Sequence, residues 1–148
     1  MTGDLPGSVL FCCTMNSIRS PMAEAIMKRL HGLKVYVDSA GVRQGETDPF
    51  AVEVLGEVGL DLSRHRPKTF DDLFDEAPDL VISLSPEAHH RALELTRVNA
   101  CEVEFWPTLD PTIIEGNRDT RLQAFRDVRN QLTERILVRF PPPAAPLV

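Results

Sequence analysis

Residues 9–25 read VLFCCTMNSIRSPMAEA, a short apolar run followed by a polar loop and then by a stretch with helical spacing. The run from Val9 to Cys12 has the apolar character of a buried strand. Ser20 is a favourable helix N-cap, and the proline after it is a favourable first helical residue. Apolar side chains then recur every four residues, as on one buried helix face: Met22, Ile26 and Leu30. The stretch therefore predicts a strand, a loop and a helix in direct succession.

The predicted loop brings a thiol and an arginine to the start of a helix. Free backbone N–H groups converge at such a point and the helix dipole adds partial positive charge, so the loop is a candidate anion site. Cys13 ends the strand, and in this setting we expect a nucleophilic thiolate at neutral pH. Arg19 follows six residues later, and its planar guanidinium matches two oxygens of a tetrahedral oxyanion. These residues predict attack on phosphorus or on a group shaped like phosphate.

The same residues resemble the signature of an enzyme family. The segment from Cys13 to Glu24 fits the pattern Cys-x5-Arg-Ser-Pro-Met-Ala-Glu, which is similar to that of the low-molecular-weight protein tyrosine phosphatases. The resemblance extends more thinly from Val9 to about Phe140, and it includes the arsenate reductases of the same fold. It implies a cysteine-dependent phosphomonoester hydrolase that forms a phosphocysteine on Cys13 and acts on a phosphoprotein or a small molecule. It implies neither a metal nor an organic cofactor.

The resemblance also implies roles for individual residues. Asp110, in the Asp110–Pro111 pair, corresponds to the general acid that protonates the leaving oxygen and then activates water. Arg19 would hold the equatorial oxygens of the phosphate. The implied phosphate-binding residues form one loop: Thr14, Met15, Asn16, Ser17, Ile18, Arg19 and Ser20.

A set of supporting residues is implied around Asn16. Asparagine tolerates positive φ better than most residue types, so Asn16 would hold the strained turn of the loop. Ser39 and His65 match family positions that hydrogen-bond to this asparagine. Ser20 would donate to the sulfur of Cys13 and so stabilise the thiolate.

Three departures from the family pattern bear on specificity. Met15 stands where the family usually has glycine, and Ile18 stands where many of its phosphatases have a second cysteine. Residues 42–48 contain no aromatic side chain, and Thr112 and Ile113 replace the tyrosines that often follow Asp-Pro. Both aromatic walls that would grip a phosphotyrosine ring are therefore missing, which argues against tyrosine specificity.

Arsenate reduction is the first alternative, because arsenate is tetrahedral and would fit the same loop. Residues 57–63 and the tryptophan upstream of Asp-Pro resemble the reductases more than the tyrosine phosphatases. Reduction needs a further thiol, but the positions that match the family's resolving cysteines are Ser85 and Ala92. Cys12 should point to the opposite face from Cys13, and Cys101 should lie at the far edge of the sheet. A reductase would thus need a small external thiol. The second alternative is a non-catalytic phosphate-binding module, motivated by Met15.

The order of predicted elements indicates the fold. Strands are expected at residues 8–12, 34–38, 80–84 and 103–106, with helices between them and a closing helix over 122–136. Alternating strands and helices imply an α/β three-layer sandwich with a four-stranded parallel sheet flanked by helices, and a site at the carboxyl ends of the strands. We expect a tail over 1–7, one catalytic domain over 8–140 and a Pro/Ala-rich tail over 141–148.

Composition narrows the class of protein. The 148 residues suit one domain, and the formal net charge of −6 at pH 7 argues against nucleic acid as a partner. No apolar run has the length of a membrane span, and the first residues lack the regions of a signal peptide. Three cysteines do not form a secreted disulfide framework, so we expect a cytoplasmic protein without a membrane partner. His89 and His90 face different ways on a helix, so they predict solvent-exposed side chains and no metal site.

Overall fold

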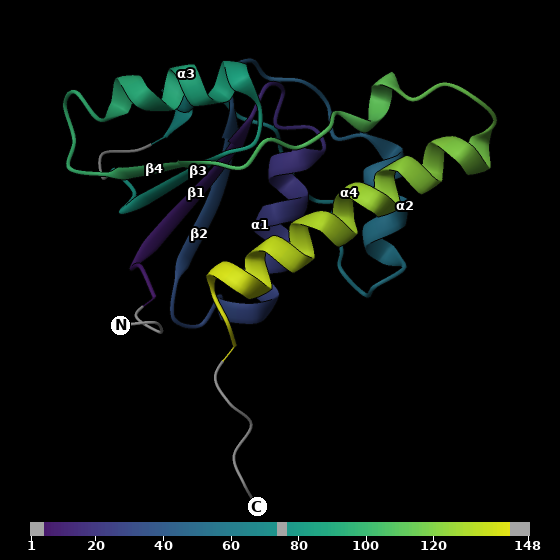
Figure 1. Cartoon of the computed structure of the whole chain (residues 1–148), viewed down its shortest axis with the longest axis horizontal. Helices are drawn as coiled ribbons and strands as arrows, with labels where there is room; N and C mark the ends of the chain where they lie inside the picture. Colours follow the sequence, from purple (N-terminus) through teal and green to yellow (C-terminus); the bar gives the residue numbers. More distant parts are fainter. Residues whose placement is uncertain (1–4, 74–76, 143–148) are drawn as a thin grey trace, which may run out of the picture.

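A parallel sheet of four strands forms the centre of the computed structural model, which describes residues 5–73 and 77–142 (Figure 1). The strands are β1 (Ser8–Cys13), β2 (Tyr36–Gly41), β3 (Leu80–Ser83) and β4 (Glu102–Phe105). Their order across the sheet is β2-β1-β3-β4, and every neighbouring pair is parallel. The chain leaves β1 toward one edge of the sheet and β3 toward the other. A switch point of this kind leaves a crevice at the carboxyl ends of the two central strands.

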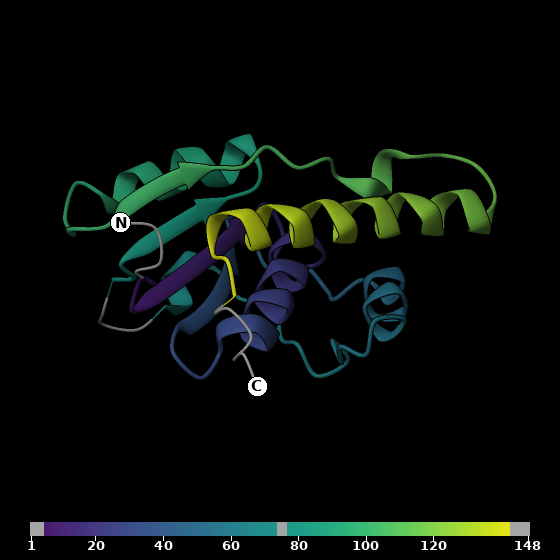
Figure 2. The same ribbon diagram turned by 60° about the horizontal axis from the view of Figure 1, so that its bottom comes forward.

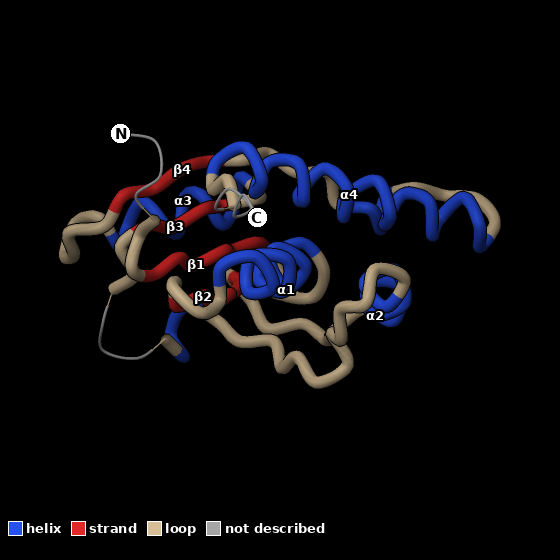
Figure 3. The backbone as a smooth tube through the Cα atoms, turned by 90° about the horizontal axis from the view of Figure 1, so that it is seen from below, coloured by secondary structure: helices blue, strands red, loops and turns tan. Residues whose placement is uncertain are grey.

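Helices cover both faces of the sheet, which confirms the predicted three-layer α/β sandwich. The helices are α1 (Arg19–His31), α2 (Pro49–Gly56), α3 (Pro86–Leu95) and α4 (Arg118–Arg139), with short 3-10 turns η1 (Phe70–Asp72) and η2 (Pro111–Ile113). Helix α3 lies on one face, while α1 and α4 lie on the other (Figures 1 and 3). Helix α2 packs against α4, where the rings of Phe50 and Phe125 meet edge to face at 5.4 Å (Figure 2). No helix among the described residues is long and apolar enough to cross a bilayer.

The alternation of side chains along β1 explains the two cores. Phe11 and Cys13 belong to the core shared with α1 and α4, whereas Leu10 and Cys12 belong to the core beneath α3. Successive residues of a strand point to opposite faces, so the two adjacent cysteines face different layers, as the sequence predicts. Cys13 is thereby placed on the side of the sheet where α1 begins.

Several of the predicted element boundaries are wrong by a few residues, and two of them bear on the site. Helix α1 begins at Arg19 with Ile18 in the N-cap position, so Ser20 lies inside the first turn and is not the cap. The reason is that the Ser20 hydroxyl contacts the sulfur of Cys13 at 2.9 Å. Strand β2 runs to Gly41, three residues beyond the expected end, because its pairing with β1 continues as far as Cys13.

Contacts at the N-terminal end differ from the tail that we expected. Leu5 packs against the core, and the N–H of Gly7 donates to Asp79 at 3.0 Å. The carbonyl of Gly7 also accepts from the N–H of Tyr36. Residues 5–7 thus contact the domain, while 1–4 and 143–148, which make up most of the two expected tails, lie outside the described residues.

Candidate active site

Residues 13–19, called here the 13–19 loop, join the end of β1 to the start of α1. The five carbonyls of Cys13 to Ser17 all accept hydrogen bonds from segments that come later in the chain. Four of them pair with backbone N–H groups of residues 42–48, at 2.9 to 3.2 Å, and the fifth, on Asn16, lies 3.1 Å from Nε2 of His65. No backbone N–H of residues 14–18 donates a hydrogen bond within the described part of the chain. The loop therefore presents its N–H groups as a set of unpaired donors, as an anion site requires.

Two glycines permit this close backbone pairing. A Cβ atom on Gly41 would meet the backbone nitrogen of Asn16 and the carbonyl oxygen of Arg43, both at 2.7 Å. A Cβ atom on Gly45 would collide with the Ser17 hydroxyl and would lie 3.1 Å from Cβ of Met15. The 42–48 segment can thus lie directly against the 13–19 loop because these positions carry no side chain. The side chain of Met15 is 38 % exposed, lies close to Gly45 and lines the pocket described below.

Asn16 holds the turn at the centre of the loop. Its backbone φ is +54°, in the left-handed region that asparagine tolerates, and its side chain is fully buried. The amide nitrogen donates to the hydroxyls of Ser20 at 2.9 Å and Ser39 at 3.0 Å. The amide oxygen accepts from the N–H of Lys68 at 2.9 Å and lies 3.1 Å from Nε2 of His65. The structure thus brings together the supporting residues that the resemblance implies.

The arginine and the aspartate of the expected mechanism line the same pocket. Nη1 of Arg19 donates to the carbonyl of Thr108 at 3.0 Å, which ties the start of α1 to the loop after β4. Oδ1 of Asp110 accepts from the N–H and the hydroxyl of Thr112, at 2.9 and 2.7 Å. Both contacts of Asp110 use one oxygen, so Oδ2 has no protein donor in the described chain.

A pocket of about 290 Å³ contains the reactive groups. Its lining residues come from the 13–19 loop, the 42–48 segment and the loop after β4: Cys13, Thr14, Met15, Ser17, Ile18, Arg19, Glu46, Asp48, Asp110 and Thr112. Sequence reasoning did not identify Glu46 or Asp48 as lining residues. Asp48 is also the N-cap of α2, where its side chain accepts from the N–H of Phe50. The two carboxylates and Asp110 give the mouth an acidic character that no sequence motif signals.

Burial changes the acidity of the groups around this site. Burial lowers the pKa of His65, although its hydrogen bond to the carbonyl of Asn16 acts in the opposite direction. His65 is thus held in its neutral form at pH 7, with Nε2 as the donor toward Asn16. Burial also raises the pKa of the Cys12 thiol well above its usual value, so this neighbour of Cys13 stays protonated.

The remaining thiols lie away from the pocket. Cys101 directly precedes β4, whose first residue pairs with the first residue of β3, at the end of the sheet opposite Cys13. Ser85 is buried beside the loop and its hydroxyl accepts from that of Thr14 at 3.0 Å, while Ala92 is a buried residue of α3. Neither Cys12 nor Cys101 lines the pocket.

The paired histidines of α3 differ from their expected exposure. The ring of His89 stacks on Phe105 at 4.6 Å and hydrogen-bonds the Ser83 hydroxyl at 2.8 Å, so it is half buried and not solvated, whereas His90 is exposed as expected. Within the described residues, no three histidine, cysteine or acidic side chains form a group that could hold a metal ion.

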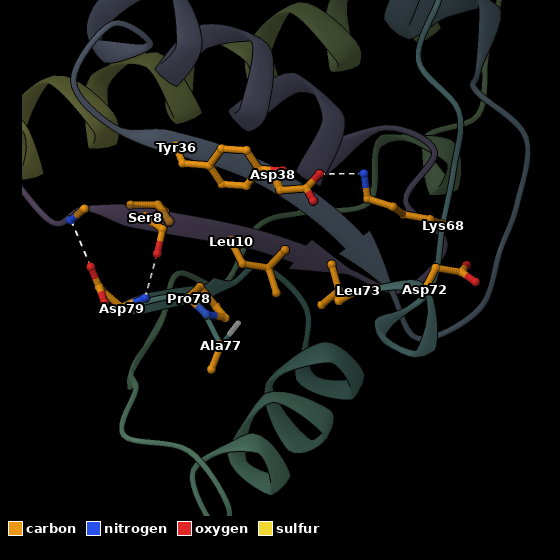
Figure 4. A pocket seen from close by; sticks show the side chains of 12 residues that line it. Ser8, Leu10, Tyr36, Asp38, Lys68, Asp72, Leu73, Ala77, Pro78 and Asp79 are labelled. Carbon is orange, nitrogen blue, oxygen red and sulfur yellow. Dashed lines mark hydrogen bonds and ion pairs between the residues drawn. The ribbon is translucent and has the colours of Figure 1, made fainter. Parts of the chain in front are cut away.

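A larger cavity, of about 840 Å³, lies near the start of β1 and the edge of the sheet (Figure 4). Its side chains include the Asp38–Lys68 ion pair and Asp79, which contacts Gly7 and Ser8. The described residues that line it include no cysteine and no arginine. The reactive groups are therefore confined to the smaller pocket.

Comparison with known proteins places this site in a family. Residues 8–137 match the family described as "Low molecular weight phosphotyrosine protein phosphatase". An arsenate reductase of Halalkalibacterium halodurans is 34% identical over 128 residues, covering 86% of this chain and 91% of that protein. A glutaredoxin arsenate reductase of Synechocystis is 33% identical, covering 86% and 92% of the two chains.

A solved structure carries the same fold. The YwlE arginine phosphatase, solved as a cysteine-to-serine mutant with a phosphorylated active site serine, is 28% identical with a TM-score of 0.68. The match covers 86% of this chain and 89% of that one. The chain therefore belongs to the low-molecular-weight phosphotyrosine protein phosphatase family, whose members similar to it include both phosphatases and arsenate reductases.

Proposed function

We propose that the chain is a cysteine-dependent phosphatase that hydrolyses its substrate through a phosphocysteine on Cys13. One observation carries the proposal: a nucleophile, a guanidinium and a carboxyl group with one uncommitted oxygen line the same 290 Å³ pocket, above a loop of unpaired N–H groups. The phosphorylated serine in the solved structure of the YwlE arginine phosphatase supports a phosphoenzyme at the corresponding position.

The mechanism assigns a role to each of these groups. Cys13 attacks phosphorus in line with the leaving group, while Arg19 and the N–H groups of the 13–19 loop hold the three equatorial oxygens. Asp110 gives a proton from Oδ2 to the leaving oxygen, since Oδ1 is held by Thr112. The same carboxylate then takes a proton from the water that attacks the phosphocysteine, which releases inorganic phosphate and restores the thiolate.

Arsenate reduction is the second candidate, favoured by the curated arsenate reductases that are 33 to 34% identical to this chain. Arsenate would form an adduct with Cys13 in the same loop. Completing the reduction would need an external thiol, because Ser85 and Ala92 occupy the positions of the family's resolving cysteines. The similarity to the glutaredoxin arsenate reductase of Synechocystis supports such a thiol.

The test of the proposal is hydrolysis of p-nitrophenyl phosphate from pH 5 to 8. We expect Cys13→Ser to abolish turnover and Asp110→Asn to reduce it by about 100-fold or more, because both chemical steps use that carboxyl group. Thr112→Val is the matched control. It removes the hydroxyl contact to Oδ1 of Asp110, the oxygen that does not transfer the proton, and should leave most of the activity.

Other outcomes discriminate the alternatives. A folded protein without turnover on p-nitrophenyl phosphate would contradict the phosphatase proposal. Arsenite formation from arsenate in the presence of glutathione or glutaredoxin would then establish the reductase. If both assays fail while inorganic phosphate still binds, the site is the non-catalytic module that the sequence leaves open.

A further inference from the structure

We propose that Glu24 is a positioning residue for the Cys13 thiolate, acting through a line of hydrogen bonds formed by Ser39, Asn16 and Ser20, in which Asn16 donates outward to both serines. Glu24 lies one turn inside α1, and Oε1 accepts from the Ser39 hydroxyl at 2.5 Å. The inference rests on the proposed function in taking Cys13 as the nucleophile, but it concerns the state of the sulfur and is testable without any substrate.

The orientation of Asn16 fixes the middle of the chain. A backbone N–H can only donate, so the N–H of Lys68 identifies the amide atom that it contacts as Oδ1. The two hydrogens of Nδ2 are then directed to the hydroxyl oxygens of Ser20 and Ser39. Each serine thus accepts from Asn16 and must send its own proton elsewhere.

The two ends of the chain receive those protons. An ionised carboxylate can only accept, so Glu24 takes the proton of Ser39. The remaining proton, on Ser20, is directed at the sulfur of Cys13, which lies 2.9 Å away. The sulfur is therefore an acceptor in this arrangement, and a thiolate is a much better acceptor than a thiol.

Burial stabilises the direction of each hydrogen bond in this network. Asn16, Ser20 and Ser39 have no exposed surface, and Cys13 is 2 % exposed. Every buried side-chain polar atom in the described residues has a partner. Because Asn16, Ser20 and Ser39 are shielded from solvent, reversing a bond between them would leave a buried donor or acceptor unsatisfied, which is costly.

Lys28 binds the carboxylate oxygen of Glu24 that does not contact Ser39. Its ammonium contacts the other carboxylate oxygen, Oε2, at 2.5 Å from the next turn of α1. Glu24 and Lys28 line a cavity of about 710 Å³ whose other charged or titratable side chains are Arg29, Asp61, Arg64, His65, Arg66 and Lys68. Asp38 pairs with Lys68, and Arg19 and Asp110 lie in the pocket in front. When residue 24 carries an amide, the presence or absence of Lys28 should decide whether its oxygen or its nitrogen faces Ser39.

The experiment substitutes Glu24→Gln and measures alkylation of Cys13 by iodoacetamide from pH 5 to 9. Lys28 can only donate, so it should hold the oxygen of the introduced amide and turn the NH2 group toward Ser39. Ser39 would then face two donors and lose the acceptor for its own proton. We expect alkylation at pH 6 to fall by about 3- to 10-fold, as loss of one buried hydrogen bond would cause, with the midpoint of the rate profile moved to higher pH.

The direction of the shift separates this proposal from a simple charge effect. Removing a negative charge near the sulfur would by itself favour the thiolate and move the midpoint to lower pH. A midpoint that is unchanged or lowered in Glu24→Gln would therefore overturn the proposal. Tandem mass spectrometry assigns the label to Cys13 and distinguishes it from Cys12 and Cys101, whose pKa values are both raised by burial.

A double variant supplies the rescue. In Glu24→Gln/Lys28→Met the amide is free to turn its oxygen to Ser39, so we expect the midpoint to return toward that of Lys28→Met alone. Failure of this rescue, with both proteins folded by thermal melting, would show that Glu24 acts only through packing. Wild-type alkylation that is fast at pH 6 without any phosphatase turnover would count against the proposed function and leave this inference standing.

Discussion

Asn16 shows how much of the site depends on one side chain, because four hydrogen bonds to its amide hold a backbone with φ of +54°. The sequence could indicate Asn16 through its residue type, and Ser39 and His65 through the resemblance. It could not indicate the N–H of Lys68, because nearly every residue type has a backbone N–H and the residue type does not show which one donates. The family signature ends at Glu24, but the sequence assigns this residue no role, because a glutamate in a helix is ordinarily a solvated residue.

His65 should make stability depend on pH. Burial lowers its pKa in the folded chain, so between its unfolded value and its folded value the unfolded chain binds more protons. The unfolding free energy should therefore fall as pH drops from 7 to 5. His65→Gln keeps a donor for Asn16 but does not titrate, so its stability should fall less over this range.

Urea unfolding at both pH values measures the difference between these two proteins. Carboxyl groups elsewhere titrate alike in both, so the comparison isolates His65. An equal loss of stability in wild type and His65→Gln would contradict this account.

At the scale of elements, the pairing of residues 42–48 with the 13–19 loop determines where the N–H groups point. Gly41 lies at the start of this pairing, and a Cβ atom there would meet backbone atoms only. Because backbone cannot rotate away as a side chain can, we expect Gly41→Ala to destabilise the protein by roughly 2 kcal/mol. It should also lower phosphatase activity by disturbing Asn16, and chemical denaturation with an activity assay measures both effects.

Gly56→Ala is the matched control for that substitution. A Cβ atom on Gly56, the last residue of α2, would meet nothing within 4 Å. Alanine favours the helix by about 0.5 to 1 kcal/mol over glycine, so this variant should be as stable as wild type or slightly more stable. If the two alanine variants behave alike, close backbone approach is not what selects glycine at position 41.

The elements differ in how far their sequence determines them. The apolar run of β1 predicts local structure, and so do residues such as Asp48 and Ser85, which cap the helices that follow them, because each depends on side chains near in sequence. The start of α1 was misplaced because Ser20 serves the sulfur of a residue seven positions earlier. The 42–48 segment pairs with the 13–19 loop through backbone hydrogen bonds, so apart from its glycines this pairing produces no pattern in the amino-acid sequence.

At the scale of the whole molecule, the switch between β1 and β3 places the site, and charge is expected to select its substrate. Thr14 follows β1 and Ser85 follows β3, and their hydroxyls meet at 3.0 Å across the crevice between the two strands. The chain carries a net charge of −6, and the mouth adds three carboxylates to one arginine. Attraction of phosphate must therefore come from the 13–19 loop and Arg19, because the carboxylates around them repel an anion.

Glu46 gives this charge balance a test. It is exposed at the mouth and has no hydrogen-bond partner among the described residues, so Glu46→Gln removes one charge with little loss of structure. We expect kcat/KM for p-nitrophenyl phosphate, an anion, to rise roughly threefold at low ionic strength, which is a modest Coulomb effect in water. For a phosphoarginine peptide, whose guanidinium the carboxylates would attract, kcat/KM should fall.

The control is Glu102→Gln, which makes the same change in net charge at the start of β4, the end of the sheet away from the pocket. It should leave both rates unchanged. The two Glu46→Gln effects should also shrink in 0.5 M salt, because exposed charges are then screened. Equal effects of Glu46→Gln and Glu102→Gln would mean that the total charge of the protein governs its encounter with the substrate. If only Glu46→Gln changes the rates, and in opposite directions for the two substrates, the pocket mouth favours a cationic leaving group.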